Sequence, residues 1–516
     1  MSEKGSAADV RRPVVLLVGC GVALFAASIL MSGYKVYYHN QSLQIPLVHL
    51  LNDPSLYPND PFAATLPYYA SAVWRVVAWG SRAVGLEPLL LGLFLIERML
   101  LLVGAARLAM ALAPGSRNAP VWAMAFFAMC PTPFLGGGTI SMPYFEQTGL
   151  AVAFLLLAMA AFYRGRAVEW AIWMGIALNC NSMYGAYALT YFAAAFIADP
   201  GHRREWRRWL GALLGSAVLA LPSIWMTGSA YSRGAVDDRL WITAARLRVP
   251  HHLFPMTWSP VSYVKFNAVL FATLVVLWTY RTRVGGLLRG AGVLAAVAMA
   301  WLGFAFAAAW IESPAMLVVQ PTRATDLWYC FALAAIGAAL GLRVGSGARV
   351  ALLVTLAAFL AGAGTFGMRA EQKSSVLRAL YWTPGLSERQ AAAWAQSHTP
   401  RDAVFLVNPN WGDFRALSKR PVFVTWKDGS ALLWYRPFVT GWVERLREIG
   451  YDVSRRGIPG RRIGAQLDSL YTALTDDRVL CLSRAYGVRY WVVPAGRASR
   501  FPVVYRNRLY KVLKAR

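Results

Sequence analysis

The chain has 516 residues, of which 57% are hydrophobic and only 15% are charged. Soluble globular proteins are about half apolar and about a quarter charged, so this composition excludes an ordinary soluble domain. Apolar runs of about 20 residues recur, each long enough to cross a bilayer, and they indicate a polytopic α-helical membrane protein. The formal net charge of +27 is explained in such a protein by basic cytoplasmic loops and by contact with anionic lipid. No nucleic-acid partner is therefore expected.

The apolar runs predict about eleven transmembrane helices. In chain order, the predicted ranges are 14–33, 87–112, 119–135, 146–163, 168–180, 183–198, 209–226, 264–280, 290–310, 326–342 and 348–368. The first range is too long for the apolar part of a signal peptide, and we expect it to remain as an uncleaved helix. A polar interruption at 179–182 must face protein or water if it lies at membrane depth.

Basic residues predict the topology. They collect before the first predicted helix and in the short loops after helices two, four, six, eight and ten. Because Arg and Lys are enriched in short cytoplasmic loops, the amino terminus is expected to be cytoplasmic. The loops after helices one and seven, and the tail, are then extracytoplasmic. The expected location is the inner (plasma) membrane of a bacterium, crossed many times.

Two parts of the chain are expected. Residues 1–368 form a transmembrane module with long outer loops at 34–85 and 227–263, and residues 369–516 form a small C-terminal extracytoplasmic α/β domain. Within the first outer loop, residues 68–85 have the period of an amphipathic helix that lies on the membrane. In the tail, helix and strand patterns alternate. The predicted tail elements are a helix that opens at Ser387 and ends before Thr399, strands at 403–407, 421–425 and 488–493, and a helix at 439–449.

Two aspartates in the first outer loop, Asp53 and Asp60, are candidate catalytic residues. A general base needs a carboxylate in a fixed position, and partial desolvation raises its pKa. Asp60 lies between Pro58 and Pro61 and is favoured as the base. The alternative is that Asp-Pro and Asn-Asp-Pro sequences form turns and helix caps, and for Asp53 this is the better interpretation.

Adjacent histidines, His251 and His252, follow Pro250 in the second outer loop. Histidines can bind a metal or donate a hydrogen bond to a phosphate. Neighbouring side chains in a loop point in different directions, and the remaining ligands of a zinc site are missing. Substrate binding is therefore favoured over a metal site, with capping and packing as the alternative. No metal ligand is assigned, and a divalent metal is the only cofactor left open.

A third candidate site precedes the tenth predicted helix, where Gln320 and Arg323 lie at the expected outer surface. The planar guanidinium can bind two phosphate oxygens at once, which suits a lipid-linked phosphate. The alternative is an arginine that extends to lipid headgroups.

Several of these segments resemble the GT-C class of integral membrane glycosyltransferases. The resembling pieces are His39-Asn40-Gln41, Pro46-Leu47-Val48, the stretch Leu51 to Phe62, Pro250-His251-His252, Gln320 with Arg323, and Phe501 to Asn507. The resemblance implies an acidic first outer loop with interfacial helices and an outer C-terminal domain. It also implies a polyprenyl-phosphate sugar as donor and an aspartate of that loop as base.

The sequence departs from the better-known members in one place. Those proteins carry an acidic pair directly after the first helix, where this chain has His39 and Asn40. These two residues are assigned to substrate binding. Either Asp60 or Asp53 takes over the role of the acidic pair, or that catalytic role is absent.

The resulting functional hypothesis is a glycosyltransferase that transfers a sugar from a polyprenyl-phosphate donor to an extracytoplasmic glycan, lipid or protein. Membrane lipids are further expected partners. The alternative is a transporter or flippase of lipid-linked glycan, or a non-catalytic assembly protein. Transporters often contain paired repeats with broken helices, and only one break, at 179–182, is found in this sequence.

Overall fold

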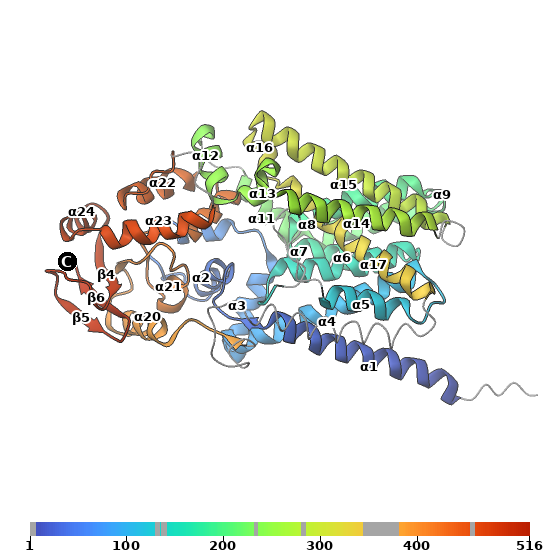
Figure 1. The fold of residues 1–516 in the computed structure, drawn as a ribbon, viewed down its shortest axis with the longest axis horizontal. Coiled ribbons are helices and arrows are strands. Elements are labelled where there is room, and N and C mark those ends of the chain that lie inside the picture. The colour runs from blue at the N-terminus through green and yellow to red at the C-terminus, as the bar shows by residue number, and fades with distance from the viewer. Residues whose placement is uncertain are drawn as a thin grey trace, which may run out of the picture. The chain divides into compact units, whose positions relative to one another are not determined.

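The computed structural model describes residues 7–129, 135, 142–231, 236–279, 285–343, 381–454 and 460–516. The chain divides into two compact units, coloured along the sequence in Figure 1. The helical unit comprises Met1–Tyr34, Leu90–Ile224 and His251–Trp382. The loop-and-tail unit comprises Lys35–Leu89, Trp225–Pro250 and Thr383–Arg516.

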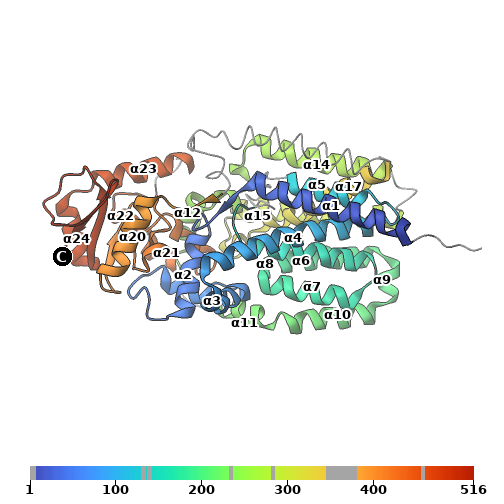
Figure 2. The same cartoon turned by 90° about the horizontal axis from the view of Figure 1, so that it is seen from below.

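Long apolar helices dominate the helical unit. Its helices, including those that reach into the adjoining loops, are α1 (Ala7–Ser32), α4 (Leu86–Leu112), α5 (Ala119–Met129), α6 (Gln147–Tyr163), α7 (Ala167–Cys180), α8 (Ser182–Ala198), α9 (Pro200–Arg204), α10 (Trp206–Leu219), α11 (Leu221–Tyr231), α13 (Pro250–Leu253), η2 (Pro255–Thr257), α14 (Pro260–Thr279), α15 (Gly285–Ile311), α16 (Pro314–Leu317), η3 (Pro321–Ala324) and α17 (Thr325–Arg343). Figure 2 shows α6, α7 and α10 lying side by side, and α5 packs against both α1 and α17.

Ten of the eleven predicted ranges overlap helices. Residues 130–134 of the range 119–135, and the whole range 348–368, lie outside the described residues. Among the described residues, three helices are long and apolar enough to cross a membrane: Leu86–Leu112, Gly292–Ile311 and Pro314–Leu342. The predicted range 209–226 is divided between α10 and α11, which meet at a 63° bend, and this pair would make a fourth span. The number of crossings, about eleven, stays a prediction.

The polar break between α7 and α8 is confirmed, and the side-chain nitrogen and backbone carbonyl of Asn179 are both hydrogen-bonded within the protein. Asn179 donates from Nδ2 to the carbonyl of Leu219, the last residue of α10, over 2.7 Å. Ser223, in α11, donates to the carbonyl of Asn179 over 3.3 Å. A helix that is interrupted in an apolar environment needs such partners for its freed backbone groups. Asn179 therefore provides hydrogen-bond partners at two interruptions, the one between α7 and α8 and the one between α10 and α11.

Small residues bring α17 and α5 into close contact. A Cβ atom added at Gly341 would lie 2.3 Å from the backbone nitrogen of Ala119, and one added at Gly337 would lie 2.7 Å from the Cα of Ala123. Two glycines four residues apart lie on one face of a helix, where they let two backbones approach. Backbone contact between α5 and α17 therefore contributes to the core of the helical unit.

The loop-and-tail unit combines short helices with a mixed sheet. Its elements are α2 (Gln41–Asn52), η1 (Ala63–Tyr68), α3 (Ala72–Val84), α12 (Asp238–Arg248), α20 (Leu386–His398), β3 (Val404–Leu406), α21 (Phe414–Ser418), η4 (Lys427–Leu433), α22 (Phe438–Glu448), α23 (Gly460–Ala473), α24 (Asp476–Tyr486), β4 (Val488–Pro494), β5 (Val503–Arg506) and β6 (Tyr510–Lys514). Two short strands, β1 (Tyr34–Lys35) and β2 (Tyr381–Trp382), lie outside this sheet.

The sheet has the order β3-β4-β6-β5. Strands β3 and β4 are parallel, with Phe405 opposite Tyr490, and the other two pairings are antiparallel. The predicted tail helices correspond to α20 and α22, and two predicted strands correspond to β3 and β4. The third predicted strand, 421–425, forms only a single bridge, between Val422 and Phe405. The backbone N–H of Val422 donates to the carboxylate of Asp60 instead of to a strand partner.

Both long outer loops pack with the tail, whereas the sequence had placed them with the transmembrane module. Helix α2 of the first loop packs against α21 and η4, and α12 of the second loop packs against α22 and η4. The expected amphipathic helix is α3, which buries Trp74 and Val77 and exposes Val76 and Trp79. Its position on a membrane surface stays a prediction.

Candidate functional site

The candidate residues of the first outer loop lie in the loop-and-tail unit. Asp60 follows a turn in which Tyr57 and Asn59 have left-handed φ angles of 58° and 64°. The side chain of Asp60 is fully buried. Its Oδ2 accepts from Arg415 Nε at 2.6 Å and from the N–H of Val422 at 3.0 Å. The turn around Asp60 is therefore joined directly to the tail.

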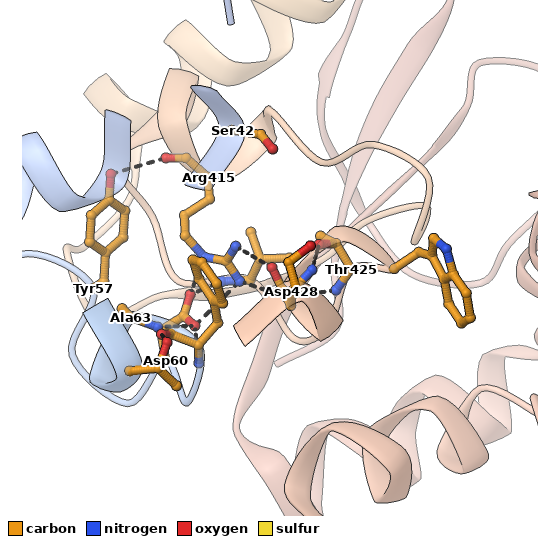
Figure 3. Close-up of polar contacts among 12 residues, drawn as sticks. Ser42, Tyr57, Asp60, Ala63, Arg415, Thr425 and Asp428 are labelled. Carbon is orange, nitrogen blue, oxygen red and sulfur yellow. Dashed lines mark hydrogen bonds and ion pairs between the residues drawn. The ribbon is translucent and has the colours of Figure 1, made fainter. Parts of the chain in front are cut away.

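The other oxygen of Asp60 is also occupied. Oδ1 accepts from the backbone N–H groups of Phe62 and Ala63, at 3.0 and 3.2 Å, and from Arg415 Nη2 at 3.3 Å. Figure 3 shows the Arg415 guanidinium between the carboxylates of Asp60 and Asp428. Asp428 accepts from Nη1 at 2.8 Å and from Nη2 at 3.0 Å. These contacts form a closed buried network.

Burial opposes the charge of Arg415, but the carboxylates of Asp428 and Asp60 together raise its pKa above the ordinary value. A buried ion pair is tolerated when every charged group is also hydrogen-bonded, as it is here. A general base needs an oxygen that an acceptor hydroxyl can reach. The geometry therefore favours an anchoring role for Asp60, and its expected role as a base stays a prediction.

Asp53 lies in a more open position. Its Oδ1 accepts from the backbone N–H and the hydroxyl of Ser55, at 3.1 and 2.6 Å, and its Oδ2 lies 2.9 Å from Nη1 of Arg401. These hydrogen bonds from Ser55, together with Arg401, lower the pKa of Asp53. Asp53 forms the turn that the sequence favoured, and 39% of its side chain remains exposed.

His39 and Asn40 immediately precede α2. His39 has a left-handed φ of 52°, and its carbonyl accepts from the hydroxyl of Ser42 at 2.7 Å. Asn40 accepts from Lys427 Nζ at 2.7 Å. Lys427, Arg415 and Asp428 were missed by sequence reasoning, because no local pattern in the tail marks them as partners of a loop more than 350 residues earlier.

The second group of candidate residues belongs to the helical unit. Arg323 lies in η3, and its guanidinium carbon is 5.1 Å from the ring centre of Tyr184 in α8. Nη1 donates to Oε1 of Gln320 at 3.3 Å. Nε is buried and has no hydrogen-bond partner in the described part of the chain. Gln320 thus accepts from Nη1, and the edge of the guanidinium that carries Nε has no acceptor for Nε among the described residues.

Two buried residues that were not assigned to the site complete this cluster. The hydroxyl of Tyr184 donates to Oδ2 of Asp326 at 2.5 Å, and Asp326 is 2% exposed. Asp326 is the second residue of α17, three positions after Arg323. That spacing in the sequence was the available signal, since an arginine that is partly withdrawn from water is commonly balanced by a nearby carboxylate.

The adjacent histidines lie next to the same segment. Thr322 donates from its hydroxyl to the carbonyl of His252 at 2.5 Å, and Trp258 donates to the carbonyl of His251 at 3.1 Å. The two imidazole rings are 4.0 Å apart, centre to centre. The backbone around His252 is therefore close to Gln320 and Arg323. Among the described residues, no group of three or more His, Cys, Asp or Glu side chains is arranged to hold a metal ion.

Comparison with solved structures bears on the fold. The arabinofuranosyltransferase AftD from Mycobacteria superposes with a TM-score of 0.50 at 15% sequence identity, over 93% of this chain and 35% of the AftD chain. The chain has a GT-C-like fold. It thus spans about a third of the AftD chain, and likeness at this level of identity concerns the fold alone.

The archaeal oligosaccharyltransferase AglB from Archaeoglobus fulgidus, solved with an inhibitory peptide and a dolichol-phosphate, gives a TM-score of 0.47 at 13% identity, over 95% of this chain and 70% of that chain. A family model described as a domain of unknown function (DUF6798) matches residues 387–449, which lie in the loop-and-tail unit. No curated protein matches the sequence.

Proposed function

We propose that this GT-C-like membrane protein transfers a sugar from a polyprenyl-phosphate donor to an extracytoplasmic glycan, lipid or protein acceptor. The observation that carries the proposal is the arrangement of Arg323. Its guanidinium is supported by the Tyr184 ring and by Gln320, and its Nε is buried without a hydrogen-bond partner in the described residues. A buried donor of this kind needs an acceptor, and a phosphate oxygen of the donor lipid would supply it.

The chemistry follows from the arginine fork. Nε and the Nη2 on the same side can each donate to one phosphate oxygen, so that the contact is bidentate. When the bond between the sugar carbon and the phosphate oxygen breaks, negative charge grows on the phosphate. A preorganised guanidinium in an environment with little water stabilises that charge more than water would. Arg323 would therefore act on the leaving group.

The acceptor hydroxyl must lose a proton as it attacks the sugar carbon. Of the two aspartates expected to take it, Asp60 has both oxygens engaged by Arg415 and backbone N–H groups, whereas Asp53 is partly exposed. We therefore assign the proton acceptor to Asp53. Its lowered pKa makes Asp53 a weaker base than an ordinary aspartate, so accessibility and not basicity supports this assignment, and the Asp60 network would hold its loop. His39, Asn40, His251 and His252 remain proposed substrate contacts.

The test measures release of polyprenyl phosphate by the purified full-length protein from a panel of polyprenyl-phosphate hexoses and pentoses. Arg323→Lys keeps the charge but loses the fork, and we expect turnover to fall about 100-fold or more. The matched control is Arg203→Gln, at an exposed arginine of α9 in the same unit, which should leave turnover unchanged.

Two results would overturn the proposal. If Arg323→Lys and Arg323→Ala both turn over at the wild-type rate, the phosphate role of Arg323 is wrong. If the wild-type protein binds the lipid donors but releases no lipid phosphate with any acceptor preparation, transfer is wrong and the transport alternative is favoured.

A further inference from the structure

Three tyrosines lie on one face of α8, at positions 184, 187 and 191. Residues spaced by three, four and seven positions share a helix face, so the three phenol groups form a row. Each side chain is at most 2% exposed. A buried phenol hydroxyl needs a hydrogen-bond partner, so each of the three must find an acceptor on the neighbouring structure.

All three hydroxyls donate to the same short segment, residues 319–326. Tyr184 donates to Oδ2 of Asp326 at 2.5 Å, and Tyr191 donates to the carbonyl of Ala324 at 3.0 Å. Tyr187 donates to the carbonyl of Gln320 at 2.9 Å and also contacts the carbonyl of Val319. We call Tyr184, Tyr187 and Tyr191 the tyrosine ladder. Its bonds bracket Arg323 on both sides along the chain.

The segment needs an external restraint. Gln320 has a left-handed φ of 48°, which a residue with a side chain rarely adopts and which persists only where its surroundings impose it. The Tyr187 hydroxyl binds the carbonyl of this strained residue. The side chain of Gln320 in turn binds Nη1 of Arg323. One strained residue therefore links Tyr187 to the guanidinium.

Helix α15 also contacts the tyrosine ladder. The Tyr187 ring packs edge-on against Trp301 of α15, with ring centres 5.2 Å apart. Trp301 also donates to the hydroxyl of Thr190 at 2.9 Å. Because α15 packs against both α8 and η3, the phenol groups have little freedom to follow the segment if it moves.

We infer that the tyrosine ladder of α8 is a set of positioning residues that holds Arg323 with its Nε edge ready for a phosphate oxygen. The inference rests on the proposed function, because it assigns the ladder to the phosphate contact of that same site. It goes further in naming residues that touch no substrate and in predicting that they act through Arg323. A ladder that only joins two helices would not act through that residue.

The experiment is a double-mutant cycle on the affinity of the detergent-solubilised full-length protein for farnesyl phosphate. With Arg323 present, loss of one hydrogen bond in Tyr187→Phe should weaken binding about fivefold. In the Arg323→Ala background, Tyr187→Phe should change the affinity less than about twofold. The effects of two substitutions on affinity are not additive when the two residues act as one unit. Tyr191→Phe should behave in the same way, and it provides a second variant if Tyr187→Phe does not fold.

Tyr163→Phe is the matched control. Tyr163 lies in α6, and its buried hydroxyl has no hydrogen-bond partner in the described residues, so its removal should leave the affinity unchanged. Equal weakening by Tyr187→Phe in both backgrounds, or no weakening in either, would overturn the ladder while leaving the phosphate role of Arg323 intact. An unchanged affinity in Arg323→Ala alone would overturn both proposals.

Discussion

The side chain of Asp60 is held in place by an unusually large number of hydrogen bonds. Its carboxylate accepts five hydrogen bonds, two from Arg415 and three from backbone N–H groups. Removing one partner of a buried ion pair leaves the other charge without compensation, which costs more than the pair contributes. The geometry therefore supports Asp60 as an anchor between the first outer loop and the tail, and its role as the base stays a prediction.

We expect Asp60→Asn to lower the free energy of unfolding by about 3–5 kcal/mol, because Arg415 then loses one of its two buried counter-charges. Thermal unfolding of the purified protein, followed by near-UV circular dichroism, measures the effect. Asp53→Asn is the control, since Asp53 is partly exposed and its pairing with Arg401 should add little. A variant Asp60→Asn with wild-type stability but no transfer would restore Asp60 as the base.

At the level of elements, hydropathy and period located most helices, but they did not show how the helices meet. The contact between α17 and α5 depends on Gly337 and Gly341, and glycine in a helix interior is unfavourable unless close packing requires it. A Cβ at Gly341 would overlap the backbone of Ala119, which cannot move aside as a flexible side chain could.

Gly341→Ala should therefore lower the free energy of unfolding by about 1–3 kcal/mol, the usual cost of overpacking. Thermal unfolding checks this. The matched control is Gly303→Ala in α15, where nothing lies within 4 Å of the added Cβ. There the better helix propensity of alanine should leave stability equal or raise it by up to about 1 kcal/mol. Equal effects of the two changes would contradict close packing at Gly341.

At the scale of the whole molecule, two long loops and the tail join into one compact unit. The loops were expected to belong to the transmembrane module because they lie between its helices in the sequence. Both loops instead pack against the tail. Helix α2 of the first loop packs on α21 and η4, and helix α12 of the second loop packs on α22 and η4. If this unit is extracytoplasmic, as the basic residues predict, α24 must also be outside.

Cys481 offers a direct test of that topology. It is exposed in α24, whereas Cys20, Cys180 and Cys330 are buried. We expect a membrane-impermeant maleimide to label Cys481 in intact spheroplasts, because the reagent reaches only the outer face of the plasma membrane.

Two controls complete the labelling experiment. Because Cys130 lies outside the described residues, every variant also carries Cys130→Ser, and Cys481→Ser should then abolish the signal. Arg203→Cys, introduced into that background in the loop predicted to be cytoplasmic, should be labelled only after the membrane is permeabilised. Labelling of Arg203→Cys before permeabilisation, with Cys481 of the native protein protected, would reverse the orientation.

The sequence by itself determined the elements whose signal is local. Apolar runs and their period located ten of the eleven predicted helical ranges, at least in part, the break at 179–182, and the tail elements α20, β3, α22 and β4. This was possible because the spacing of side chains along a helix or strand depends on residues near in the sequence. The same local signals marked Asp60 and Arg323 as unusual, yet they did not say what either side chain binds.

Only the tertiary structure decided the partners. Arg415 lies 355 residues from Asp60, and Tyr184 lies 142 residues from Asp326. No local pattern specifies such pairs, because they form when packing of the whole chain removes both groups from water. Burial then makes each charge or hydroxyl require a particular partner. That requirement joined Asp60 to Arg415 and placed the Tyr184 ring beside Arg323, with the hydroxyls of Tyr187 and Tyr191 on the carbonyls of Gln320 and Ala324.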